Sequence, residues 1–78
     1  MAAIQSPVPG TFYTQASPEE PMYKTAGDTV AAGDTIGLVE VMKTFIEVKA
    51  EAAGTFKGYV AQNGAAVTAG ETLAQLED

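Results

Sequence analysis

The chain has 78 residues, a net charge of −6, four lysines and no arginine, cysteine or histidine. A chain of this size has room for one domain with one hydrophobic core, and four basic residues are too few for a nucleic-acid surface that neutralises phosphates. Without cysteine or histidine the chain lacks disulfides, a thiolate nucleophile, the commonest transition-metal ligand and the usual neutral-pH general base. We therefore do not expect an independent enzyme.

Residues 1–78 are expected to form a single domain. The first residues lack the basic start and the apolar stretch of a secretory signal. No segment approaches the roughly 20 apolar residues that a membrane-spanning helix needs. These observations lead us to expect a cytoplasmic protein.

An internal repeat begins near the start of the chain. Residues 4–12 match residues 48–56 at an offset of 44, and residues 27–36 match residues 64–73 at an offset of 37. A duplication of this kind predicts two similar sheets that bury their apolar faces against each other. Phe12 and Phe56 take matching positions in the repeat and are expected in the core.

The first copy of the repeat carries an insertion, because its two offsets of 44 and 37 differ by seven residues. The insertion falls at about residues 14–21. Pro18, Glu19, Glu20 and Pro21 disfavour both strand and helix there. The sequence therefore predicts a protruding loop that the second copy lacks.

The remaining elements are predicted to be short strands. Residues 29–30, 35–41, 44–50 and 58–61 are strand-like runs separated by glycine, and no window has an apolar stripe at helical period. The repeated Gly-Asp/Glu-Thr sequences at residues 33–35 and 70–72 predict tight turns, and Asn63-Gly64 is a hairpin signal. The predicted fold class is all-β.

Met42-Lys43 separates two of these predicted strands. Two-residue hairpin turns favour Asn, Asp or Gly, because one or both central positions need a positive φ. If a tight turn forms at Met42-Lys43, these two residues are present there for a reason other than their conformational preference for positive φ. A primary amine on a rigid tip is a handle for covalent attachment, whereas the alternative is an ordinary solvated lysine in a longer, relaxed loop.

Pairing the strands outward from such a turn gives a definite register. Val41 then lies opposite Thr44, Glu40 opposite Phe45 and Val39 opposite Ile46. Val39, Val41, Thr44 and Ile46 share one face, which makes a reasonable cross-strand patch of mainly β-branched residues. The register supports the turn without any assumption about function.

Glu40-Val41-Met42-Lys43 resembles the attachment motif of biotinyl domains, in which Ala/Val-Met-Lys is usually followed by Met. The likeness covers nearly the whole chain, including Ser6-Pro7, residues 10–13, Gly27, residues 33–35, residues 53–55 and Leu76-Glu77. The chain is similar to the biotin carboxyl carrier family of acetyl-CoA carboxylase, within the biotin/lipoyl attachment superfamily. This resemblance implies a flattened barrel-sandwich of two four-stranded antiparallel sheets with quasi-twofold symmetry.

The resemblance also implies site residues. Lys43 would carry covalent biotin, with Glu40, Val41, Met42 and Thr44 around it, although Met is usual at the position of Thr44. Residues 14–21 match the position of the thumb, a loop that touches the biotin ring in many carriers of this type. The family usually has Thr-Pro-Ser-Pro there, and this chain has Gln15-Ala16-Ser17-Pro18. Gln15 is the expected thumb contact, because its side-chain amide can donate to and accept from a ureido group.

By resemblance, the chain is a non-catalytic carrier. A biotin protein ligase would attach biotin to Lys43, a biotin carboxylase would load a carboxyl group, and a carboxyltransferase would pass that group to an acceptor such as acetyl-CoA. Neither nucleic acid nor a membrane is an expected partner.

Three alternatives remain. A lipoyl carrier domain of a 2-oxoacid dehydrogenase shares the fold, but its turn reads Asp-Lys-Ala, so Met42 and the insertion favour biotin. A biotin carrier of another carboxylase, acting on a different acyl-CoA or on urea, would have the same motif. The third alternative is an unmodified binding module that reuses the barrel.

Overall fold

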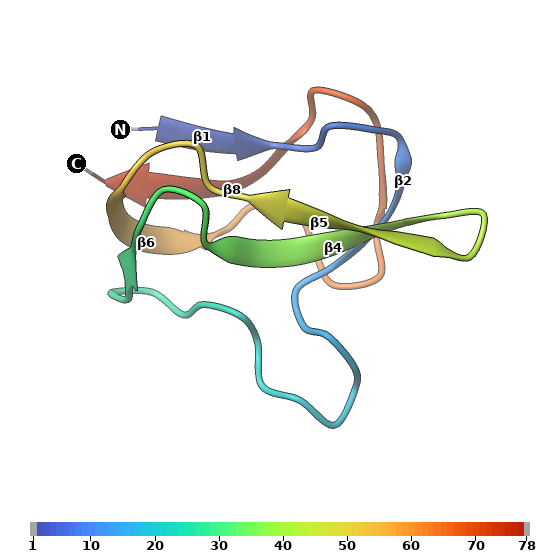
Figure 1. Cartoon of the computed structure of the whole chain (residues 1–78), viewed down its shortest axis with the longest axis horizontal. Helices are drawn as coiled ribbons and strands as arrows, with labels where there is room; N and C mark the ends of the chain where they lie inside the picture. The colour runs from blue at the N-terminus through green and yellow to red at the C-terminus, as the bar shows by residue number, and fades with distance from the viewer. Residues whose placement is uncertain (1, 78) are drawn as a thin grey trace.

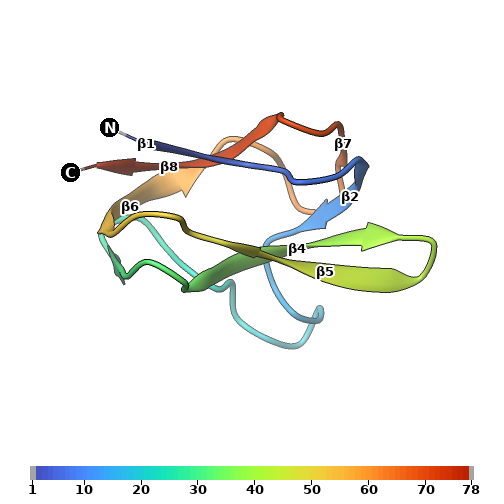
Figure 2. The same cartoon turned by 45° about the horizontal axis from the view of Figure 1, so that its top comes forward.

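The computed structural model describes residues 2–77, which contain eight strands and no helix (Figure 1), and so none long and apolar enough to cross a membrane. The strands are β1 (Ala2–Gln5), β2 (Gly10–Tyr13), β3 (Thr29–Val30), β4 (Thr35–Val41), β5 (Thr44–Lys49), β6 (Gly54–Tyr59), β7 (Ala66–Val67) and β8 (Thr72–Glu77). They form two antiparallel four-stranded sheets, ordered β1-β8-β6-β3 and β5-β4-β2-β7. Figure 2 shows these sheets as two layers. The predicted all-β fold class is confirmed.

The duplication in the sequence is a duplication in space. Each strand of the first sheet has a counterpart four strands away in the second: β1 corresponds to β5, β8 to β4, β6 to β2 and β3 to β7. The β4–β5 hairpin therefore corresponds to the antiparallel pair of β8 and β1. Its tip extends from the end of the molecule opposite the start of β1 and the end of β8 (Figures 1 and 2).

The core is built from repeat-equivalent side chains. The buried core residues include four repeat-equivalent pairs: Phe12 and Phe56, Val30 and Val67, Ile36 and Leu73, and Val39 and Leu76. Each of these pairs joins one sheet to its counterpart, which is the arrangement predicted from the repeat. The ring of Tyr59 packs against both phenylalanines, with centroids 5.9 Å from Phe12 and 4.8 Å from Phe56.

The predicted tight turns are also present. Asp34 Oδ2 accepts a hydrogen bond from Ala31 N at 2.9 Å, and Glu71 Oε1 accepts the equivalent bond from Thr68 N at 3.0 Å. The hydrogen bond from Ala31 N, followed by the one from the Lys24 side chain, lowers the pKa of the Asp34 carboxyl. Asp34 and Glu71 therefore stabilise their own turns, and we assign neither of them to the functional site.

Three of the four predicted strands match the structure. Residues 29–30 and 35–41 are β3 and β4, and the predicted strand over 44–50 ends one residue early as β5. The strand predicted over 58–61 is wrong, because the strand runs from Gly54 to Tyr59. A register shift between Phe56 and Gly58 turns Tyr59 into the core, and the chain then leaves the sheet with Val60 exposed.

Gly54 explains why that strand was misplaced. Glycine in the sequence suggests a turn, yet Gly54 is the first residue of strand β6. A Cβ on Gly54 would stand 2.8 Å from the backbone oxygen of Glu77 in the neighbouring strand β8. Glycine is present there because two backbones approach closely, which is a requirement that single-sequence patterns do not reveal.

Candidate functional site

The β4–β5 hairpin has the register predicted from the sequence. Val41 pairs with Thr44, Glu40 with Phe45 and Val39 with Ile46. Only Met42 and Lys43 remain to reverse the chain. The hairpin is therefore closed by a two-residue turn, and the longer, relaxed loop is excluded.

The turn is strained for its sequence. Met42 has φ 49° and Lys43 has φ 68°, and they are the only non-glycine residues with positive φ among residues 2–77. Two consecutive left-handed residues are the signature of a type I′ turn, which normally contains Asn-Gly. Each non-glycine residue held there costs about 1–3 kcal/mol. The hairpin predicted at Asn63-Gly64 is wrong, because the flanking strands β6 and β7 lie in different sheets, and only Gly64 of that turn has positive φ, at 84°.

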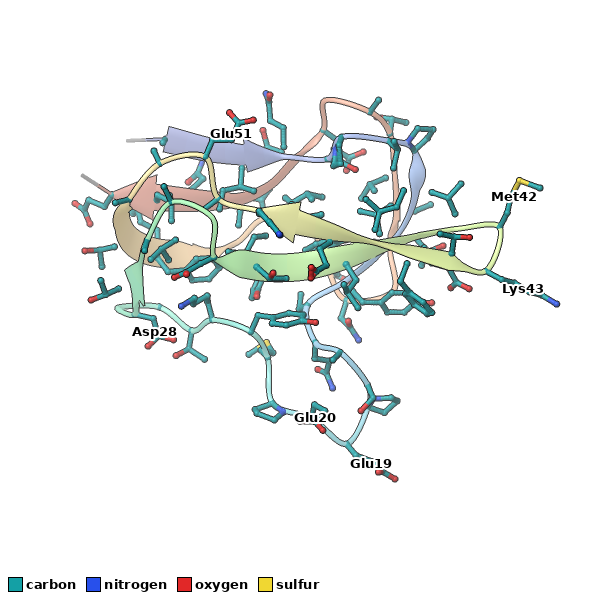
Figure 3. The ribbon with its side chains drawn as sticks, viewed as in Figure 1. Glu19, Glu20, Asp28, Met42, Lys43 and Glu51 are labelled. Carbon is teal, nitrogen blue, oxygen red and sulfur yellow. The ribbon has the colours of Figure 1, made fainter. Side chains whose placement is uncertain are left out.

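The strained turn presents its two side chains to solvent. Met42 is 93% exposed, and Lys43 is also exposed. Figure 3 shows both side chains pointing outward from the end of the hairpin, away from the two sheets. The Lys43 amine is thus held at the tip of the hairpin, where it is accessible for covalent attachment.

Glu40 and its neighbours form a small cluster close to the hairpin tip, one residue pair away from the turn. The Tyr13 hydroxyl donates to Glu40 Oε1 at 3.1 Å, and the rings of Tyr13 and Phe45 lie 6.2 Å apart. The hydrogen bond to Glu40, followed by desolvation, raises the pKa of Tyr13 above its usual range. Phe45 is 56% exposed although it contacts Tyr13. The sequence analysis assigned no role to Tyr13 or Phe45. These two aromatic residues lie on β2 and β5, on either side of β4, and both face outward.

The thumb, residues 14–21, leaves the body after β2 and protrudes beside the hairpin's sheet (Figure 1). Its base is held by Asn63, whose Oδ1 accepts from Thr14 N at 2.9 Å, and by a backbone bond from Tyr23 N to Thr14 O at 2.9 Å. Asn63, predicted only as a turn residue, therefore also anchors the thumb.

Gln15 braces the thumb from within. Its Nε2 donates to the backbone oxygen of Ser17 at 2.8 Å and to that of Glu20 at 3.1 Å. A β-bridge between Gln15 and Met22 closes the same loop. The Gln15 amide nitrogen is thus engaged inside the thumb, which leaves the side-chain oxygen to accept from a ligand. Contact between Gln15 and a biotin ring remains a prediction.

A groove of about 440 Å³ separates the thumb from the hairpin. It is lined by Tyr13, Gln15, Ala16, Ser17, Pro18, Phe45 and Asn63. The groove brings Gln15 close to the β4–β5 hairpin, as the sequence predicted for a thumb. A second cavity of about 170 Å³ lies between β1 and the end of β5, far from Lys43.

Comparison with known proteins agrees with this geometry. The sequence family described as "Biotin-requiring enzyme" matches residues 2–76. The biotin carboxyl carrier protein of acetyl-CoA carboxylase from Chlamydia trachomatis is 40% identical over 73 residues, which are 94% of this chain and 44% of that protein. Its counterpart from Haemophilus influenzae is 36% identical over 74 residues, 95% of this chain and 48% of that protein. The chain spans about half the length of these relatives.

Solved structures with the same fold include two larger enzymes. The Kluyveromyces lactis urea carboxylase matches with a TM-score of 0.78 and 29% identity, over 97% of this chain and 6% of that one. An aspartoacylase family protein from Mesorhizobium loti matches with a TM-score of 0.70 and 24% identity, over 95% of this chain and 24% of that one, which shows a shared fold only. With a matching family over residues 2–76 and a lysine at the tip of a strained hairpin, the chain belongs to the biotin-requiring enzyme family of biotin/lipoyl attachment domains.

Proposed function

We propose that residues 1–78 are one biotinyl domain, that Lys43 carries covalent biotin, and that the domain is the non-catalytic carboxyl carrier of an acetyl-CoA carboxylase-type enzyme. The single observation that carries this proposal is the strained Met42-Lys43 turn, which holds an exposed amine at the tip of a rigid hairpin. A cytoplasmic location fits the same function.

The residues present fit biotin. Attachment needs an accessible primary amine, and Lys43 is exposed at the tip of the β4–β5 hairpin. The ligase has room to approach, because the flanking Met42 and Thr44 are exposed as well. Loss of a proton frees the Nζ lone pair to attack the carboxyl carbon of biotin activated as an adenylate. The C–N bond forms as the bond from that carbon to the phosphate oxygen breaks and AMP leaves, and the resulting amide carries no charge. Bound biotin supplies a ureido nitrogen that accepts and releases a carboxyl group.

The chain's own residues contribute position rather than chemistry. The two-residue turn fixes the Lys43 backbone, so all the movement needed to visit two enzymes lies in the side chain and the attached arm. Tethering keeps the reactive group at a high effective concentration near each enzyme without tight binding of the carrier. Biotin protein ligase, biotin carboxylase and carboxyltransferase are therefore the proposed partners.

Two other carrier functions are distinguishable from this one. A lipoyl carrier would use the same tip, but the named relatives are biotin carriers and the turn has Met42 before the lysine. A biotin carrier for urea is favoured by one observation, the structural match to urea carboxylase. Acetyl-CoA remains the proposed acceptor because both quoted relatives belong to acetyl-CoA carboxylase.

Intact-mass measurement after coexpression with a biotin ligase tests the proposal. We expect one biotinyl group per chain, located on Lys43 by peptide mapping, and none on a Lys43→Arg variant. Lys49→Arg is the matched control, because Lys49 is an exposed lysine at the end of β5, the strand that follows Lys43. Biotin on Lys49, or a lipoyl group on Lys43 after coexpression with a lipoate ligase instead, would refute the assignment. Holo protein assayed with carboxyltransferases for acetyl-CoA and for urea then identifies the acceptor.

A further inference from the structure

The outer surface of the sheet β5-β4-β2-β7 carries apolar side chains next to the hairpin tip. Tyr13 pairs with Leu38 across β2 and β4, and the Tyr13 ring reaches diagonally to Phe45 on β5. Because Phe12 and Val39 point into the core, strand alternation turns Tyr13 and Leu38 outward. Tyr13, Leu38 and Phe45 are called the aromatic face below. The groove beneath the thumb continues this face.

The internal symmetry of the fold shows that this surface need not be apolar. The repeat offsets place Lys57 at the position equivalent to Tyr13, and Gln75 at the position equivalent to Leu38. The opposite sheet therefore has polar residues where the hairpin's sheet has an aromatic and a leucine. A register shift there pairs Gln75 with Gly58 rather than with Lys57, but the positions equivalent to Tyr13 and Leu38 accept polar residues, and we infer that the aromatic face serves a purpose other than folding. Phe45 is the exposed member of this face, whereas Tyr13 and Leu38 are half-buried. An apolar patch with an exposed ring beside a functional group commonly marks an interaction surface.

Charge indicates what kind of partner fits. Glu40 and Glu47 lie on the same outer surface of this sheet, and Glu19 and Glu20 are exposed at the thumb tip (Figure 3). Lys43 is the basic residue at this end, and amide formation removes its charge. Of the other three lysines, Lys24 pairs with Asp34, Lys49 is at the far end of β5 and Lys57 is on the opposite sheet. Glu19, Glu20, Glu40 and Glu47 thus border the apolar patch of the modified carrier, and Lys49 lies two residues beyond Glu47 on β5, farther from the tip.

We propose that the aromatic face is the surface on which biotin carboxylase docks the modified carrier, an inference that rests on the function proposed above. An enzyme that binds ATP and bicarbonate needs positive charge around the mouth of its active site, which complements the acidic border of this face. Phe45 inserts into an apolar recess of the partner, and Glu47 pairs with its cationic rim. The attached arm starts at the exposed tip beside this contact and enters the active site.

The test measures kcat/KM for carboxylation of the purified holo carrier by the cognate biotin carboxylase. Leu38→Gln installs the residue that the fold accepts at the equivalent position, and Phe45→Thr removes the exposed ring while keeping a strand-forming residue. Each variant is expected to lose about tenfold in kcat/KM, mainly through KM. Val60→Thr is the matched control, because Val60 is 57% exposed, close to the 56% of Phe45, but lies outside the face; it should behave as the parent.

The second arm of the test compares two charge-removing variants, one at Glu47 and one at Glu51. Glu47→Gln should lower kcat/KM severalfold at low salt and reduce its dependence on ionic strength. Glu51→Gln, an exposed glutamate two residues beyond β5 and remote from the tip, should change neither (Figure 3). Mass spectrometry of the parent and of every variant separates the two hypotheses: unmodified Lys43 in the parent refutes the proposed function. Full modification of Phe45→Thr with kcat/KM unchanged refutes the docking surface, and an increase refutes it too, because it would mean that the groove stores the arm.

Discussion

Val41 and Thr44 pair directly across the β4–β5 hairpin, which leaves Met42 and Lys43 alone to reverse the chain. A turn this short gives the lysine no backbone freedom of its own. Neither residue suits the left-handed conformation, so the fold accepts a local cost in order to keep the two side chains at the tip. Stability and attachment are therefore expected to respond in opposite directions to changes in this turn.

Met42→Asn tests that opposition. Asn tolerates positive φ, so we expect the free energy of unfolding in urea to rise by about 1 kcal/mol. The rate of biotinylation should fall, because the exposed Met42 side chain is lost from the surface that a ligase meets. Thr44→Asn is the control: Thr44 is in extended β5, where Asn is disfavoured, and stability should not increase. A Met42→Asn variant no more stable than the parent would show that the turn is not strained.

The sequence predicted this hairpin well because its register depends on local alternation. The repeat also contains information about strands that were not predicted from it. Applying its offset of 37 residues to β3 and β4 gives β7 and β8 to within one residue. What could not be predicted depends on contacts between distant segments. The closeness of Gly54 to Glu77, and the bracing of the thumb by Asn63, arise only after the two sheets have assembled.

The hydrogen bond between Tyr13 and Glu40 makes a prediction about titration. The bond holds the phenol proton, so the pKa of Tyr13 is raised, and ionisation should occur above pH 10. Glu40→Gln removes the negative charge and should lower that midpoint, as followed by NMR of ring-labelled tyrosine. Tyr59 provides the control, because its raised pKa comes first from burial and should persist in the variant. Since a raised folded-state pKa favours folding below the unfolded value, this contribution is lost as the pH rises through the folded midpoint.

Bracing by Gln15 predicts a selective effect on the thumb. Gln15→Glu replaces the donating Nε2 with an oxygen facing the carbonyl oxygens of Ser17 and Glu20, so the loop should open. Hydrogen exchange of the Glu20 amide, which donates to Ser17 O at 3.1 Å, should accelerate, with global stability changed by less than about 1 kcal/mol. Gln62→Glu adds the same charge in an exposed loop outside the thumb and should leave that amide unchanged. Equal exchange in both variants would contradict a bracing role.

The symmetric core predicts equal and coupled losses. Phe12→Leu and Phe56→Leu should each destabilise the domain by about 1–2 kcal/mol in urea unfolding, because each ring is fully buried and packs on Tyr59. The double variant should deviate from the sum by at least about 0.5 kcal/mol, since both rings share the Tyr59 contact. Phe45→Leu makes the same change at a 56% exposed position and should stay within about 0.5 kcal/mol of the parent. Strictly additive losses at Phe12 and Phe56 would mean that the two halves of the barrel are stabilised independently, and that Tyr59 does not link them.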